Sequence, residues 1–320
     1  RDSYIALFPQ IIAGPIVRFH QIRDQLIERT ETSHRFARGI TRFAHGLAKK
    51  VIIADTVAPA VIEVFSTPTG ELNTATAVFG IVAYSVQLYF DFSAYSDMAI
   101  GIGEMLGFRF PENFARPYAS RSVTEFWRRW HISLSQWFRD YLYIPLGGNR
   151  GSEFQTYRNL IIVFVATGLW HGANWTFLVW GCYHGLLLLI ERRLGIGRDS
   201  SGRAGVMAQA RTIGLVLIGW VFFRSPDIPY AIGYFGALLN PDGWVLPEVT
   251  RALGMTGLIA LSIGIATVAL PRTWVTGVRL EMDSTPLAGA LRLLVVGVAL
   301  PIALILVVSG TFSPFLYFRF

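Results

Sequence analysis

Charged residues are scarce in this chain of 320 residues. They make up 15% of the sequence, whereas hydrophobic residues make up 52% and the mean hydropathy is +0.45. Soluble domains carry about 25% charged residues, so the composition excludes an ordinary soluble domain. It indicates a protein that lies largely in a membrane.

Lysine and cysteine are almost absent. Lys49 and Lys50 are the only lysines among 28 basic residues, and Cys182 is the single cysteine, so an intrachain disulfide is excluded. Cys182 falls in an apolar segment, where we expect a buried and unreactive thiol. The net charge of +7 comes from arginines between apolar stretches. That distribution favours loops on the cytoplasmic side beside anionic lipid, and not a nucleic-acid partner.

Several motifs of cofactor chemistry are also missing. The sequence has no Cys-x-x-Cys, no His-Glu-x-x-His, no glycine-rich phosphate loop, no 20–50-residue repeat and no heptads. His171 and His184 are 13 positions apart, or about 20 Å along one helix, so they share a metal only if the chain folds back between them. We therefore expect no bound metal or cofactor. The chain begins at Arg1 rather than Met and shows no signal peptide, and we interpret it as a fragment that lacks its true N-terminus.

Long apolar runs predict an all-α, polytopic integral membrane protein. Clear spans are expected at residues 74–108, 252–270 and 289–309, with a shorter one at 212–223. Residues 159–190 form either one long helix or two helices that break near 172–174. Arginine-rich segments at 109–158 and 191–211 belong on the same side of the membrane, which requires an even number of crossings and favours the break.

The remaining segments are connections. Residues 4–17 are apolar but too short to span and predict a surface or re-entrant element. Residues 39–66 predict an amphipathic or partly inserted helix. Residues 225–250 contain four prolines and are expected to form a loop. The aromatic tail at 315–320 suits a membrane interface.

The arginine-rich region at 109–158 is expected to be cytoplasmic and amphipathic or re-entrant. Within it, residues 124–143 have helical periodicity, and their tryptophans gather on one face. At 100° per residue, His131 points with those tryptophans and away from Arg128 and Arg129. This orientation indicates either a hydrogen-bonded structural histidine or one wall of a reaction channel.

His171 is the first candidate for catalysis, because it places an imidazole in the most apolar part of the sequence. Ionisable side chains at membrane depth are functional candidates. A histidine there is a suitable general base for an alcohol that attacks an acyl thioester, with Trp170, Asn174 or His131 orienting the groups. Asp97, on the 74–108 span, is expected to face the protein interior or a water-filled cavity, where it either contacts substrate or holds an arginine or a helix end structurally. A transporter that uses such residues as a proton relay is the alternative.

The chain resembles the membrane-bound O-acyltransferase (MBOAT) family, in the branch of the bacterial alginate O-acetyltransferase membrane subunit. The matching runs are FPQ at 8–10, AGP at 13–15, FDFSAYSDMA at 90–99, PENF at 111–114, FWRRWHISLS at 126–135, DYLYIPLGGN at 140–149, GLWHG at 168–172 and WVFFR at 220–224. The resemblance implies a helical bundle with a central tunnel. It makes His171 the catalytic histidine and His131 the second active-site histidine.

On this basis we expect residues 1–320 to be a single membrane acyltransferase domain, the C-terminal part of an MBOAT protein, with the catalytic histidine on the segment 159–190. The expected donor is acetyl-CoA or another acyl thioester. The expected partners are the lipid bilayer, a periplasmic acetyltransferase protein and a polysaccharide acceptor at the bacterial inner membrane. The substrate-binding candidates are Trp130, Trp170, Asn174, Asp97, Arg128 and Arg129. The two arginines meet donor phosphates or, structurally, anchor their helix to lipid headgroups.

Overall fold

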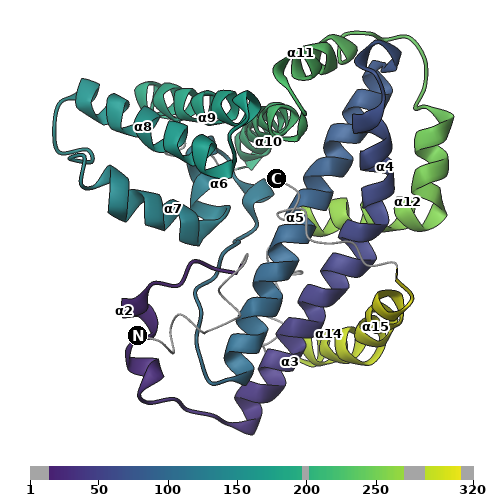
Figure 1. The fold of residues 1–320 in the computed structure, drawn as a ribbon. Coiled ribbons are helices and arrows are strands. Elements are labelled where there is room, and N and C mark those ends of the chain that lie inside the picture. The colour runs from purple at the N-terminus through teal and green to yellow at the C-terminus, as the bar shows by residue number, and fades with distance from the viewer. Residues whose placement is uncertain (1–13, 197–201, 270–284, 311–320) are drawn as a thin grey trace. The chain divides into compact units, whose positions relative to one another are not determined.

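The computed structural model describes residues 14–196, 202–269 and 285–310, and within these ranges the regular structure is helical (Figure 1). The predicted Phe8-Pro9-Gln10 motif and the aromatic tail at 315–320 lie outside the described residues. Within the described ranges, four helices are long and apolar enough to cross a membrane: Thr74–Met105, Gly205–Arg224, Pro247–Val268 and Pro286–Val308. The predicted spans are therefore confirmed in length and composition, and the one predicted at 212–223 is longer than expected.

The chain divides into two compact units. Among the described residues, the first contains residues 14–57, 86–114, 255–269 and 285–310, and the second contains residues 58–85, 115–196 and 202–254. The division runs through α5 (Thr74–Met105), through α4 (Asp55–Ser66) and through α12 (Pro247–Ala269).

In the first unit, α3 (Ser33–Ala48) lies along the second half of α5 (Figure 1). Glycines allow the two backbones to touch: a Cβ at Gly39 would lie 2.6 Å from the Gly101 carbonyl oxygen, and one at Gly46 would lie 2.7 Å from that of Ala94. The π-helical turn η3 (Lys49–Ala54) continues α3 into α4, so the amphipathic helix predicted at 39–66 is one nearly continuous helical rod. The segments η7 (Val295–Ala299) and α15 (Leu300–Val308) pack beside α3, and α14 (Pro286–Leu294) leads into η7.

The second unit is built around α8 (Glu153–His171) and α9 (Trp175–Leu194), which form an antiparallel hairpin (Figure 1). It also contains α6 (Val123–Arg129), α7 (Ile132–Phe138), η6 (Arg139–Tyr143) and α10 (Gly202–Arg224). The expectation of a loop across 225–250 was wrong in part, because α11 (Ile228–Ala237) forms there. Its start is stabilised by Asp227, which accepts a hydrogen bond from the Tyr230 amide at 2.7 Å, and by Pro229 in the first turn.

Candidate active site

The break predicted near 172–174 is confirmed, and it places His171 at the end of a helix. α8 ends at His171, and Asn174 begins α9 by accepting a hydrogen bond from the Thr176 amide at 3.1 Å. The Asn174 side-chain amide also donates to the Pro226 carbonyl at 2.7 Å, which ties the turn to the end of α10. The hairpin can close tightly because Gly168 has no Cβ, and a Cβ there would lie 2.4 Å from the Phe177 carbonyl oxygen.

The His171 ring is surrounded by aromatic rings. Its centroid lies 5.0 Å from that of Trp170, 5.1 Å from Trp180 and 5.0 Å from Phe223, each in an edge-on arrangement. The residue itself is only partly buried. These rings exclude water from the sides of the imidazole and hold its orientation. Part of His171 nevertheless remains accessible.

His131 lies in a turn between two short helices. The single helix predicted at 124–143 was wrong: α6 ends at Arg129, Trp130 is extended, and His131 adopts a left-handed backbone with φ 43° and ψ 56°. A non-glycine residue in this region costs of the order of 1 kcal/mol or more and persists only where the surrounding structure enforces it. Such strain is concentrated at functional sites, which makes this turn a candidate for one.

The predicted inward orientation of His131 is confirmed, since the residue is 4% exposed. Its ring centroid lies 6.3 Å from that of Trp170, the neighbour of His171. Burial lowers the pKa of His131 to about 3, and the charge of His171 adds a smaller effect in the same direction. The His131 imidazole is therefore neutral at neutral pH, with one ring nitrogen as donor and the other as acceptor. Trp170, itself partly exposed, contacts both histidines.

A core of tryptophans holds the turn of His131 in place. Trp130 stacks on Phe126, with centroids 5.6 Å apart, and also contacts Trp220 at 5.0 Å. The Trp220 indole donates to the Tyr118 hydroxyl at 3.1 Å, and that hydroxyl donates to the Ser85 carbonyl at 2.9 Å. Buried aromatic pairs contribute about 0.5–1.5 kcal/mol beyond the area they bury. The backbone strain at His131 is offset by this packing.

Glu191, which the sequence analysis did not select, fixes the start of α6. From the last turns of α9 its carboxylate accepts bonds from the amides of Val123 and Thr124, at 2.7 and 2.8 Å, and from the Thr124 hydroxyl at 2.8 Å. The residue is 5% exposed. A carboxylate at a helix N-terminus is favoured by the helix dipole, so Glu191 joins α9 to the helix that leads into His131. The sequence feature that could have indicated this role is a single acidic residue, Glu191, at the end of an apolar helical segment.

Replacement of Glu191 tests this link. Glu191→Ala leaves the buried amides of Val123 and Thr124 without acceptors, so we expect a loss of about 2–4 kcal/mol in the free energy of unfolding. Glu191→Gln keeps an acceptor oxygen and should lose less. Thermal unfolding of purified protein in detergent would measure the order wild type, Gln, Ala. Equal melting temperatures for wild type and Glu191→Ala would contradict the proposed joint.

Three of the other candidates in the histidine region have structural roles. Arg129 forms an ion pair with Glu125 one turn earlier in α6, whereas Arg128 is exposed. Trp130 is 5% exposed and belongs to the tryptophan core, and Asn174 caps α9. Their predicted contacts with substrate stay predictions. Cys182 differs from expectation, because its side chain is exposed on α9 and is not buried in the protein.

The chain does fold back between His171 and His184, which was the condition for them to approach each other. Both rings pack against Trp180, at centroid distances of 5.1 and 5.3 Å. The Trp127 indole donates to Nδ1 of His184 at 3.4 Å. Among the described residues, no group of three His, Cys, Asp or Glu side chains is arranged to hold a metal ion.

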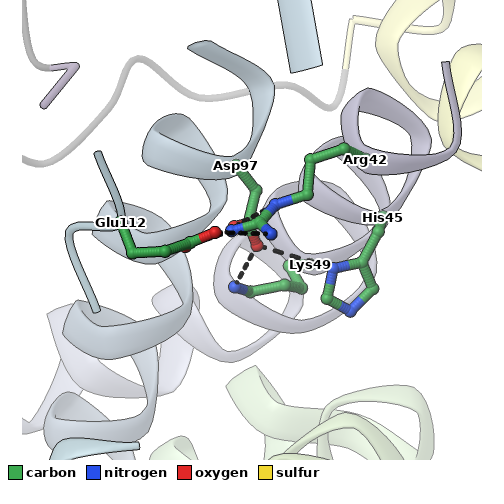
Figure 2. A network of polar contacts seen from close by, with 5 residues as sticks. All are labelled: Arg42, His45, Lys49, Asp97 and Glu112. Carbon is green, nitrogen blue, oxygen red and sulfur yellow. Dashed lines mark hydrogen bonds and ion pairs between the residues drawn. The ribbon is translucent and has the colours of Figure 1, made fainter. Parts of the chain in front are cut away.

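Asp97 belongs to the first unit, where it lies in a buried ionic network (Figure 2). It accepts hydrogen bonds from Nε of Arg42 at 2.8 Å and from Nζ of Lys49 at 2.7 Å, and Nδ1 of His45 is 3.5 Å from its second oxygen. Arg42 also pairs with Glu112 at 2.7 Å. Burial lowers the pKa of His45 and that of Lys49, and Asp97 opposes both shifts. These contacts agree with the structural interpretation of Asp97, in which it pairs with an arginine. Its predicted contact with substrate stays a prediction.

A second buried ionic cluster lies in the same unit. Lys50 is 1% exposed and donates to Asp55 at 2.7 Å and to Asp91 at 2.6 Å. Two aspartates thus share one lysine, and the pairing joins η3, α4 and α5. The two lysines of the chain are therefore both used to neutralise buried carboxylates.

Comparison with known proteins identifies the family. The model of the membrane-bound O-acyltransferase family, MBOAT, matches residues 3–195, which is more than half of the chain and includes both histidines of the site. The chain belongs to the MBOAT family. It is accordingly a helical, multi-pass membrane protein of an acyltransferase family, as the sequence predicted.

Individual relatives are named for transfer of acetyl groups. The chain is 45% identical to a probable alginate O-acetylase AlgI of Pseudomonas putida, over 99% of this chain and 68% of the relative. It is 52% identical to the protein of that name in Pseudomonas aeruginosa, over 80% of this chain and 48% of the relative. It is 40% identical to a peptidoglycan O-acetyltransferase of Helicobacter pylori, over 78% and 48%. The chain thus spans from about half to about two thirds of the length of these relatives.

Proposed function

We propose that this MBOAT chain is the catalytic part of a membrane O-acetyltransferase that acts on an exported polysaccharide such as alginate. In this proposal an acetyl group passes from a cytoplasmic thioester donor, acetyl-CoA or a similar compound, across the bacterial inner membrane. The acceptor hydroxyl is a serine of a periplasmic acetyltransferase partner or the sugar itself. The names and the extent of the similar proteins support the reaction class.

One observation carries the assignment of residues: His171 is a partly exposed imidazole at the end of a helix, and Trp170 joins it to the strained turn of His131. These are two histidines from separate segments of the sequence, held in one unit by the same aromatic wall. A general base must be oriented and must keep a face open to the reacting hydroxyl. His171 meets both requirements.

The proposed reaction is direct transfer. His171 accepts the proton of the attacking hydroxyl, and the oxygen adds to the thioester carbonyl. The carbon–sulfur bond then breaks, and the imidazolium returns the proton to the departing thiolate, so the products are an ester and a free thiol. His131, neutral because it is buried, orients the acyl carbonyl by donating a hydrogen bond to it. Trp170 and Asn174 border the acyl group, and Arg128 and Arg129 meet the donor phosphates.

Sealed membrane vesicles of defined orientation test the direction of transfer. Acetyl-CoA labelled in the acetyl group is supplied to vesicles that expose the cytoplasmic face or to vesicles that expose the opposite face, with acceptor on the other side. We expect labelled ester only when the donor meets the cytoplasmic face, accompanied by one free thiol for each ester. Label transferred equally from both faces, or esters formed without release of thiol, would contradict the proposal. Vesicles without the protein provide the background.

A further inference from the structure

His184 lies in the middle of α9 with 0% of its surface exposed, and the proposed reaction gives it no part. Its Nδ1 accepts a hydrogen bond from the Trp127 indole at 3.4 Å. Nδ1 therefore carries no proton, and the neutral ring is protonated at Nε2. A second proton would set an N–H against the Trp127 N–H and break that bond. His184 thus acts as a fixed hydrogen-bond acceptor and not as a base.

The other edge of the His184 ring fits against α10. Its Nε2 has no hydrogen-bond partner among the residues that the structure describes. It faces Gly219, where a Cβ would lie 2.5 Å from Nε2, so the imidazole has room only because residue 219 is glycine. The ring is therefore held on one side by a hydrogen bond from α6 and on the other side by direct contact with α10.

The His184 ring joins the segments that carry the two histidines of the proposed reaction. Trp127, its donor, lies in α6, which ends two residues before His131. Trp180 packs on the His184 ring at 5.3 Å and on the His171 ring at 5.1 Å. Trp127 also contacts Trp180 edge-on at 5.5 Å. These three rings connect the helix that leads into His131 with the hairpin that presents His171.

The helix α6 depends on such contacts for its position. It has seven residues, and isolated helices shorter than about 12 residues are marginal in water, so tertiary contacts determine where it lies. Glu191 follows His184 by seven positions, or about two turns of α9, so both project from the same face. Glu191 binds the first amides of α6, and His184 binds Trp127 near its end. One face of α9 thus holds α6 at both ends.

We propose that His184 is a positioning residue for the acetyl transfer, which acts through Trp127 to set the place of His131 relative to His171. This inference rests on the proposed function and adds to it a residue that touches neither donor nor acceptor. A misplacement of about 1 Å can lower a rate about 100-fold. A single neutral hydrogen bond contributes only modestly to stability, so its loss should be visible mainly in the rate.

Turnover of matched variants in the vesicle assay tests the proposal. His184→Leu should lower kcat about 10- to 100-fold with KM unchanged, because His184 does not touch substrate. His184→Asn places a carbonyl oxygen near the position of Nδ1 and should restore most of the rate. Trp127→Phe removes the donor and should also lower kcat, and combining it with His184→Leu should lower kcat no further, because both changes break one bond.

A control variant loses a buried hydrogen bond elsewhere in the same unit. The Tyr234 hydroxyl donates to the Ala77 carbonyl at 2.7 Å, away from both histidines of the reaction. Tyr234→Phe removes that bond and should leave kcat unchanged. A fall in kcat for Tyr234→Phe as large as that for His184→Leu would reduce the role of His184 to general stability and overturn the assignment.

A distance measurement separates failure of this inference from failure of the proposed function, because it needs no turnover. Arg128 in α6 and Ala173 in the turn after α8 are both exposed. Spin labels at Arg128→Cys and Ala173→Cys, with Cys182→Ser, report the distance between the two segments by pulsed electron paramagnetic resonance. We expect His184→Leu to shift or broaden this distance and His184→Asn to keep the wild-type distribution.

Three results would overturn the assignment. One is a wild-type distance distribution in His184→Leu, which counts even if no acetyl transfer is detected. Another is an unchanged kcat in His184→Leu, or additive losses in the double variant, in vesicles where the wild type transfers acetyl. The third is a folded His184→Asn that is as slow as His184→Leu. If His184→Leu does not fold, Trp127→Phe provides the same distance test of the same bond.

Discussion

Replacement of His171 by alanine should reduce the ester content of the exported polysaccharide to background while the protein still inserts into the membrane. Loss of a positioned general base costs typically 10²–10⁴-fold in rate. The ring is partly exposed and contributes no hydrogen bond to the packing of the described residues, so the fold should tolerate its removal. The measurements are acetyl groups per sugar residue in secreted polymer and the amount of protein in purified membranes.

A control variant at another histidine, and the different outcomes expected for a transporter or a structural subunit, make this test specific. His34→Ala, at an exposed position of α3, should leave acetylation unchanged. If the chain is a transporter, His171→Ala will instead stop export of polymer while acetylation per chain stays constant. If it is a purely structural subunit, His171→Ala will be silent and charge reversals across 121–139 will abolish assembly. Acetyl content that survives in His171→Ala would end the catalytic assignment.

The second large effect should be on stability. Asp97→Ala removes the carboxylate that pairs with Arg42 and Lys49, which are 5% and 11% exposed in their side chains. Two buried cations then lose their shared partner, and breaking a buried ion pair on one side costs about 3–5 kcal/mol. We expect a large fall in the melting temperature of detergent-purified protein and little protein in the membrane. Asp97→Asn keeps an acceptor oxygen, so its melting temperature should lie between those of the wild type and Asp97→Ala.

This experiment also decides between the two interpretations of Asp97. A residue that only contacts substrate would, when changed to alanine, leave the amount and melting temperature of the protein intact and lower acetylation alone. Asp24→Ala is the control, because the Arg23–Asp24 pair is exposed and such pairs contribute about 0–1 kcal/mol. Equal melting temperatures of Asp97→Ala and Asp24→Ala would contradict the structural role.

The spans and the break before α9 could be predicted because they depend on local properties. A helix needs about 20 apolar residues to cross a bilayer, and residues 74–105, 247–268 and 286–308 supply them. The break at 172–174 followed from glycine and asparagine in an apolar run together with the arginines on either side. These signals require no knowledge of distant contacts.

The turn at His131 and the partners of Asp97 could not be predicted in this way. Residues 128–133 contain no glycine, proline or asparagine, so nothing local indicates a left-handed residue. The break is enforced by packing of Trp130 on Phe126 and Trp220, which comes from 90 positions further along the chain. Likewise Arg42 and Lys49 precede Asp97 by 55 and 48 positions. Tertiary contacts, not periodicity, determine both features.

Because His131 has a left-handed backbone, the direction of its imidazole is not set by the helical periodicity of α6 or α7. A side chain within a helix rotates by about 100° when one residue is inserted before it. At His131 the direction is set by an indole core on one side and a capped N-terminus on the other. Substitutions on the exposed faces of α6 and α7 can therefore adapt this surface to different donors or lipids without changing the orientation of the His131 imidazole.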